Sequence, residues 1–143
     1  MKIDIITFLR RNRHKKLTIA VWFYTGWFRF CIRFIEMKRL RPYFGVCGEE
    51  SPEEASEEDY RYAKLVSAQV GRSARKTPWE SKCLVRALTA QKLLKRKGIA
   101  STMYLGVKTE DNKMVAHAWL RVGKLYVTGG NGKDYAMVDK YRA

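Results

Sequence analysis

The chain has 143 residues, which is enough for one domain with a hydrophobic core and too few for two ordinary domains. Hydrophobic residues make up 46% of the chain and charged residues 30%, a balance typical of a globular protein and not of a disordered one. The 29 Lys and Arg against 14 Asp and Glu give a net charge of +15 and indicate an acidic partner. No zinc-ligand spacing and no nucleic-acid-binding motif accompanies this charge, so we do not expect nucleic acid to be that partner.

Residues 1–47 form a basic segment rich in aromatic side chains. The apolar run at residues 17–28 is shorter than the roughly 20 residues that a spanning helix needs, so we predict a helix that does not cross a membrane. Large apolar side chains recur at helical steps, at Trp22, Phe23, Trp27, Phe30, Phe34 and Ile35. Such a stripe packs either on the core or a partner, or on an anionic membrane surface through Trp22, Phe23, Trp27 and Phe30.

Residues 48–59 form an acidic loop that leads into a helix. Ser51-Pro52-Glu53-Glu54 matches a helix start, with Ser51 as the cap and proline at the first helical position. The sequence therefore predicts a helix that begins there and runs through Tyr60 to about Val70.

Residues 60–143 contain the candidate catalytic residues and are the predicted Cys–His peptidase core. Thr77-Pro78-Trp79-Glu80 is a capping pattern, and either Thr77 or Ser81 would begin a helix that Gly98 ends. Beyond it the pattern alternates as in strands at 101–107, 115–122 and 125–128, with turns at 110–113 and 123–124. We therefore predict one compact α+β domain in which N-terminal helices precede a helix packed on a small antiparallel sheet.

The spacing of the cysteines does not indicate disulfide bonds or a metal site. Cys31, Cys47 and Cys83 are odd in number and lack close spacing, so we expect neither a disulfide framework nor a metal, and we expect a reducing cytoplasm. Cys31, inside the aromatic run, is expected to be a buried small hydrophobe.

Cys83 and His117 together suggest a thiol enzyme. Cys83 falls near a helix start, where backbone amides, Lys82 and Arg86 favour the thiolate that attacks a carbonyl. His117 falls in mid-strand among apolar residues, either as a core histidine bonded to a backbone carbonyl or as the base that activates Cys83. Trp119 shares its side of the strand, either as packing or as a wall of the substrate site, and the Cys83 backbone N–H is the expected oxyanion donor.

Several segments of the chain, taken in their order along the sequence, resemble the lasso-peptide leader peptidases. These are transglutaminase-like and papain-like cysteine proteases. The resemblance covers about half of the chain. It lies in Lys76-Thr77-Pro78-Trp79, Cys83-Leu84-Val85-Arg86-Ala87-Leu88, Leu94-Lys95-Arg96-Lys97-Gly98-Ile99, Leu105-Gly106-Val107 and His117-Ala118-Trp119. The basic, aromatic first half is similar in character to family members whose leader-recognition domain is a separate protein.

The resemblance implies a bacterial, cytoplasmic peptidase that removes the leader near a Thr just before the core, ahead of macrolactam closure. Cys83 matches the nucleophile and His117 the base, and no cofactor is implied. The partners would be the precursor peptide, a separate leader-recognition protein and an asparagine-synthetase-like cyclase. The acid expected after the His strand is missing from Val127-Thr128-Gly129-Gly130-Asn131, so Thr128, Asn131 or Asp134 would orient the imidazole, or that role is vacant.

Two other functions fit the same residues. One is a transglutaminase-like thiol acyltransferase, which would join its acyl group to an acceptor other than water. The other is a basic adaptor for a membrane or nucleic acid, in which Cys83 and His117 are structural.

Overall fold

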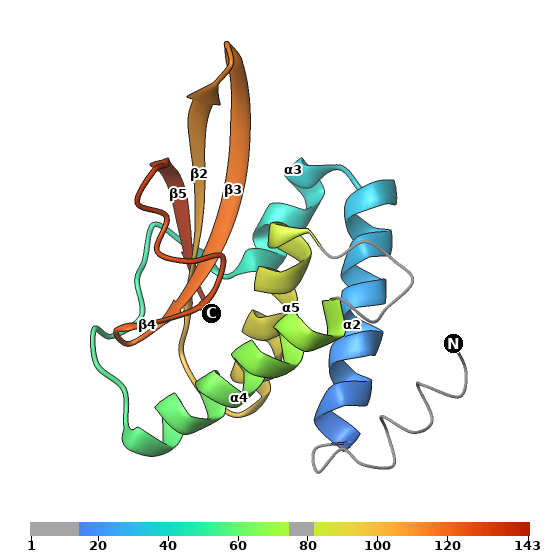
Figure 1. The fold of residues 1–143 in the computed structure, drawn as a ribbon, viewed down its shortest axis with the longest axis vertical. Helices are drawn as coiled ribbons and strands as arrows, with labels where there is room; N and C mark the ends of the chain where they lie inside the picture. The colour runs from blue at the N-terminus through green and yellow to red at the C-terminus, as the bar shows by residue number, and fades with distance from the viewer. Residues whose placement is uncertain (1–14, 75–81) are drawn as a thin grey trace.

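The computed structural model describes residues 15–74 and 82–143, with helices packed on one side of a five-stranded sheet (Figure 1). The helices are α2 (Lys15–Phe34), α3 (Met37–Leu40), the 3₁₀ turn η1 (Arg41–Phe44), α4 (Glu57–Ala74) and α5 (Cys83–Arg96). The strands are β1 (Val46–Cys47), β2 (Thr102–Glu110), β3 (Lys113–Val122), β4 (Leu125–Thr128) and β5 (Ala136–Arg142). The predicted α+β class is therefore confirmed.

The sheet is antiparallel, in the order β1-β5-β2-β3-β4. Both predicted turns are present, because Asp111 and Asn112 have positive φ angles between β2 and β3, and Gly123 does so between β3 and β4. The β2–β3 hairpin extends well beyond the helices (Figure 1). Strand β5, which the sequence pattern did not predict, lies between β1 and β2.

Helix α5 ends as predicted. The N–H of Gly98 donates to the carbonyl of Lys95, and that of Ile99 donates to the carbonyl of Leu94, which is the Schellman arrangement. Gly98 has a φ of 73°, a conformation that costs glycine little. The caps expected at Thr77 or Ser81 lie outside the described residues.

The start of α4 differs from the prediction. The helix begins at Glu57, and the N–H of Asp59 donates to the hydroxyl of Ser56, so Ser56 takes the capping role expected of Ser51. Ser51 is buried instead, where its hydroxyl shares a 2.7 Å hydrogen bond with that of Thr102. The prediction was wrong because tertiary contact with β2 holds Ser51 in an extended loop.

The core lies between the helices and one face of the sheet. Strand β3 contributes Ala118, Leu120 and Val122 to it, and α5 contributes Ala87, Leu88, Ala90, Leu93 and Leu94. Cys31 is buried as predicted. In contrast, Phe23, Trp27, Phe30 and Phe34 of the aromatic stripe are each more than half exposed, so the stripe does not pack into this core. No helix among the described residues is long and apolar enough to cross a membrane.

The other face of the sheet is joined to the loop before α4 by Arg121. Its guanidinium group is buried and donates to the carbonyls of Ser51, Pro52 and Gly123 and to the hydroxyls of Tyr104 and Thr102. Hydrogen bonds from a charged donor are the stronger kind, and here they satisfy the buried carbonyls of Ser51 and Gly123.

We expect Arg121→Met to lower the free energy of unfolding by about 2 kcal/mol, because it leaves buried carbonyl groups without a donor. Urea unfolding followed by circular dichroism measures this loss. Arg142→Met is the control, since Arg142 is an exposed strand arginine, and it should change stability by less than about 0.5 kcal/mol. Equal effects of the two substitutions would contradict the role given to Arg121.

Candidate active site

Cys83 is the first residue of α5. Its side chain is partly buried and packs against the edge of the core, and Lys82 stands at the N-cap position. The first N–H groups of a helix lack partners within the helix and carry partial positive charge, so they stabilise an anion at this end. Cys83 therefore lies at a helix start, as the sequence predicts.

His117 lies in the middle of β3, with its ring held on three sides. Its Nε2 lies 2.7 Å from the carbonyl oxygen of Gly129, and its ring stacks on those of Tyr135 at 4.7 Å and Trp119 at 5.9 Å between centroids. Because a carbonyl oxygen can only accept, Nε2 donates to Gly129, and Nδ1 is the ring nitrogen left outside this contact. Nδ1 is therefore the atom available as a base.

The structure does not join Cys83 to His117. Neighbouring residues of a strand point to opposite faces, and Ala118 points into the core on which α5 packs. His117 points to the other face, where Trp119 and Tyr135 lie. Within residues 15–74 and 82–143, no hydrogen bond connects the Cys83 sulfur to the His117 ring.

The group that orients His117 is a backbone carbonyl. Among the described residues, neither Thr128, Asn131 nor Asp134 hydrogen bonds to the ring: the Thr128 hydroxyl is buried without a partner, and Asn131 Oδ1 accepts from the N–H of Lys133. Gly129, one residue beyond β4, provides the contact. The Gly129-Gly130 pair was the available sequence signal, because a backbone group can approach closely where side chains are missing.

Cys47 and Cys31 are poor alternatives to Cys83 as nucleophiles. The Cys47 thiol donates to Asp139 Oδ1 at 3.2 Å, and this bond raises the pKa of Cys47 because it favours the protonated form. Burial raises the pKa of Cys31. Both environments disfavour the thiolate, the species that attacks a carbonyl.

Tyr141 and Asp139 form a pH-sensitive pair on β5. Burial and the 2.6 Å hydrogen bond to Asp139 Oδ2 raise the pKa of Tyr141 to about 12. The folded state therefore favours neutral Tyr141, so its contribution to stability is complete below the ordinary tyrosine pKa of 10.0 and is lost as pH rises toward about 12.

We expect the free energy of unfolding to fall over that pH interval, and Tyr141→Phe to make the fall shallower. Some slope should remain, since burial also raises the pKa of Tyr62 and Tyr104. Urea titrations across the interval test this, with Tyr43→Phe as the control because Tyr43 is 83% exposed. An unchanged slope in Tyr141→Phe would refute the assignment.

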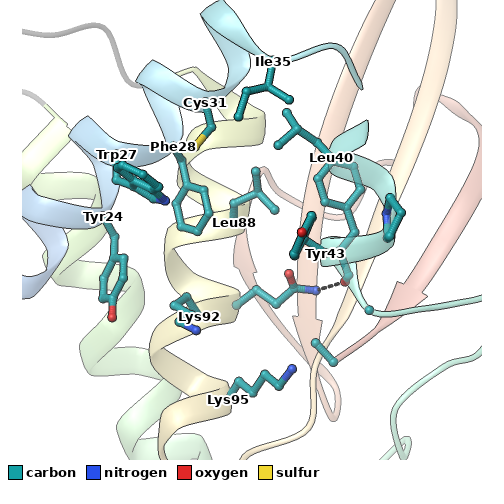
Figure 2. A pocket seen from close by; sticks show the side chains of 15 residues that line it. Tyr24, Trp27, Phe28, Cys31, Ile35, Leu40, Tyr43, Leu88, Lys92 and Lys95 are labelled. Atoms are coloured by element: carbon teal, nitrogen blue, oxygen red, sulfur yellow. Dashed lines mark hydrogen bonds between the residues drawn. The ribbon is translucent and has the colours of Figure 1, made fainter. Parts of the chain in front are cut away.

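A separate apolar pocket of about 580 Å³ opens between α2, η1 and α5 (Figure 2). Phe28, Cys31 and Leu88 line its wall, and Lys92 and Lys95 lie on the α5 side. Gln91, the polar residue on the apolar face of α5, donates to the carbonyl of Phe44 and so secures η1 at the pocket. Among the described residues that line the pocket, the one thiol is that of the buried Cys31, so the pocket offers an apolar surface and no exposed thiol.

Cys83 thus begins a helix that packs on an antiparallel sheet, and His117 lies on a central strand of that sheet. A family model described as the transglutaminase-like superfamily matches residues 32–141. The chain therefore belongs to the transglutaminase-like superfamily, whose members are usually cysteine-based enzymes. Searches of curated proteins and of solved structures returned no match.

Proposed function

We propose that the protein is a cysteine peptidase that removes the leader from a lasso-peptide precursor, with Cys83 as nucleophile and His117 as base. The observation that supports this most is the position of Cys83 at the first residue of α5 within a transglutaminase-like domain. The order of motifs around Cys83 and His117, which resembles that of the leader peptidases, narrows the substrate to a precursor peptide.

The proposed reaction has two steps. In the first, His117 Nδ1 takes the thiol proton, the Cys83 sulfur bonds to the scissile carbonyl carbon, and the Cys83 N–H donates to the developing oxyanion. The C–N bond breaks, the proton passes to the leaving amine, and the leader remains as a thioester. In the second, His117 takes a proton from water, which attacks the thioester carbonyl carbon. The C–S bond breaks, the leader is released as a carboxylic acid, and the Cys83 sulfur regains a proton from His117.

Because Cys83 and His117 are not hydrogen bonded in the described arrangement, the proposal requires the pair to be completed when the precursor and its leader-recognition partner bind. The register of β2 against β5 shifts between Leu105 and Gly106, and Gly106 is the residue paired with His117. The β2–β3 pairing around His117 has no such shift, so completion of the pair requires a rearrangement of β3 or of the start of α5. On this account the protein alone cleaves slowly, and its partner accelerates cleavage.

Two other functions are distinguished by product. A thiol acyltransferase would use the same two residues but produce a cross-linked amide. A basic adaptor would form no reaction product. A structural histidine bonded to a backbone carbonyl is also expected in an adaptor, so the contact of His117 with Gly129 does not distinguish an adaptor from an enzyme.

Mass spectrometry of a lasso precursor incubated with the protein, with and without the leader-recognition protein, separates the three. If free leader and free core form, the result supports the peptidase. If an amine is included in the mixture and a conjugate of leader and amine forms, the result supports the acyltransferase. An unchanged precursor in both mixtures counts against either enzyme.

A further inference from the structure

Helix α2 presents a continuous apolar surface away from the core. Its members recur at steps of three and four residues and are each more than half exposed: Ile19, Phe23, Trp27, Phe30 and Phe34. We refer to these five as the α2 apolar face. The rings touch one another, since the centroids of Trp27 and Phe30 lie 6.1 Å apart and those of Phe30 and Phe34 lie 4.8 Å apart. Contiguous exposed apolar surface of this kind marks an interaction site.

The charged residues of α2 itself are all basic. Helix α2 contains no acidic residue, and Lys15, Lys16 and Arg33 are exposed on it. Trp27 also lines the neighbouring pocket, where Lys92 and Lys95 project from α5 (Figure 2). Basic side chains therefore border the apolar face on α2 and on α5.

We propose that α2 lies flat on the surface of a bilayer that contains anionic lipid, with the α2 apolar face inserted at the boundary between headgroups and acyl chains. A helix with bulky aromatic side chains on one face and basic side chains beside them binds such an interface through both parts. Each basic residue near the surface adds attraction to the negative leaflet. The buried side of α2, which includes Val21 and Thr25, stays packed on α4 and α5, so docking needs no unfolding.

The charge also favours a membrane over a second copy of the chain. Two copies that met through α2 would bring their basic borders together, and each chain carries a net charge of +15. Like charges across an interface oppose association. An anionic bilayer carries charge of the opposite sign, and its acyl chains are apolar like the α2 apolar face.

Sedimentation with vesicles tests the proposal. The purified full chain is mixed with vesicles of phosphatidylglycerol and phosphatidylcholine in equal parts, or with phosphatidylcholine alone. The test variant is Phe23→Ser/Phe30→Ser/Phe34→Ser, which keeps every charge, and the control is Met114→Ser/Met137→Ser, which removes exposed apolar side chains from the sheet. We expect the test variant to lower binding to the anionic vesicles about 100-fold and the control to bind as the wild type does.

A second measurement does not depend on the folding of a variant. Binding of the wild type should weaken as salt is raised and should be weaker on phosphatidylcholine alone, because part of the attraction is electrostatic. Three results would overturn the proposal: no binding of the wild type to anionic vesicles, equal binding of the triple variant, or a wild-type dimer in analytical ultracentrifugation that the triple variant abolishes.

Discussion

Cleavage of the precursor should fall by about 10⁴-fold or more when Cys83 is replaced by alanine, because the acyl-enzyme step loses its nucleophile. Neither remaining cysteine can substitute for it. Cys31 is buried, and the Cys47 thiol is held in its protonated form by Asp139. The rate of leader release, measured by mass spectrometry with the partner present, reports this loss.

His117→Ala should produce a loss of similar size, and the double variant should be no slower than Cys83→Ala, since residues that act as one unit are not additive. Cys47→Ala is the matched control, because it removes the exposed thiol and leaves Cys83 in place. A Cys83→Ala protein that still cuts the precursor would refute the thiol mechanism. If activity is lost in Cys83→Ala but not in His117→Ala, Cys83 keeps its assignment as the nucleophile and His117 is not the base.

Gly129→Ala should destabilise the fold by about 4 kcal/mol, from strain in the backbone and from overpacking. Gly129 has a φ of 75°, and an added Cβ would clash with the carbonyl oxygen of Ala118 and lie 2.9 Å from the Cβ of Trp119. Backbone on β3 cannot yield as a flexible side chain does, so the segment after β4 must move. That movement also takes the Gly129 carbonyl away from the His117 ring.

Gly130→Ala is a matched control for Gly129→Ala. Gly130 has nearly the same φ, 72°, but an added Cβ there would meet nothing within 4 Å. It should therefore cost only the left-handed conformation, about 1 kcal/mol. Urea unfolding of both variants measures the difference, and equal losses would show that the close approach of Gly129 to β3 is not important for stability.

Local signals in the sequence were sufficient to predict α5 and the two hairpins. The Gly98 stop, the Gly123 turn and the alternation along β3 act through neighbouring residues, and the structure follows them. Strand β5 was missed because its residues do not alternate in burial, and its place between β1 and β2 depends on pairing with distant parts of the chain. Ser51 was misassigned for the same reason, since its partner is Thr102 on β2.

The candidate site could be predicted only in its parts. The position of Cys83 at a helix start follows from the flanking sequence, and the shared face of His117 and Trp119 follows from strand alternation. Which face of the sheet His117 occupies depends on register, and a shift of one residue reverses it. The Gly129 carbonyl could not be inferred from side-chain chemistry, because every residue type carries that group.

Trapping of the acyl-enzyme tests the central claim most directly. The protein, its leader-recognition partner and the precursor are mixed, quenched in acid within the first turnovers, and the intact protein mass is measured. We predict a mass increase equal to that of the leader less one water, located at Cys83 by peptide mapping and missing in Cys83→Ala. Cleavage of the precursor with no adduct on Cys83, and at an equal rate in Cys83→Ala, would contradict the account.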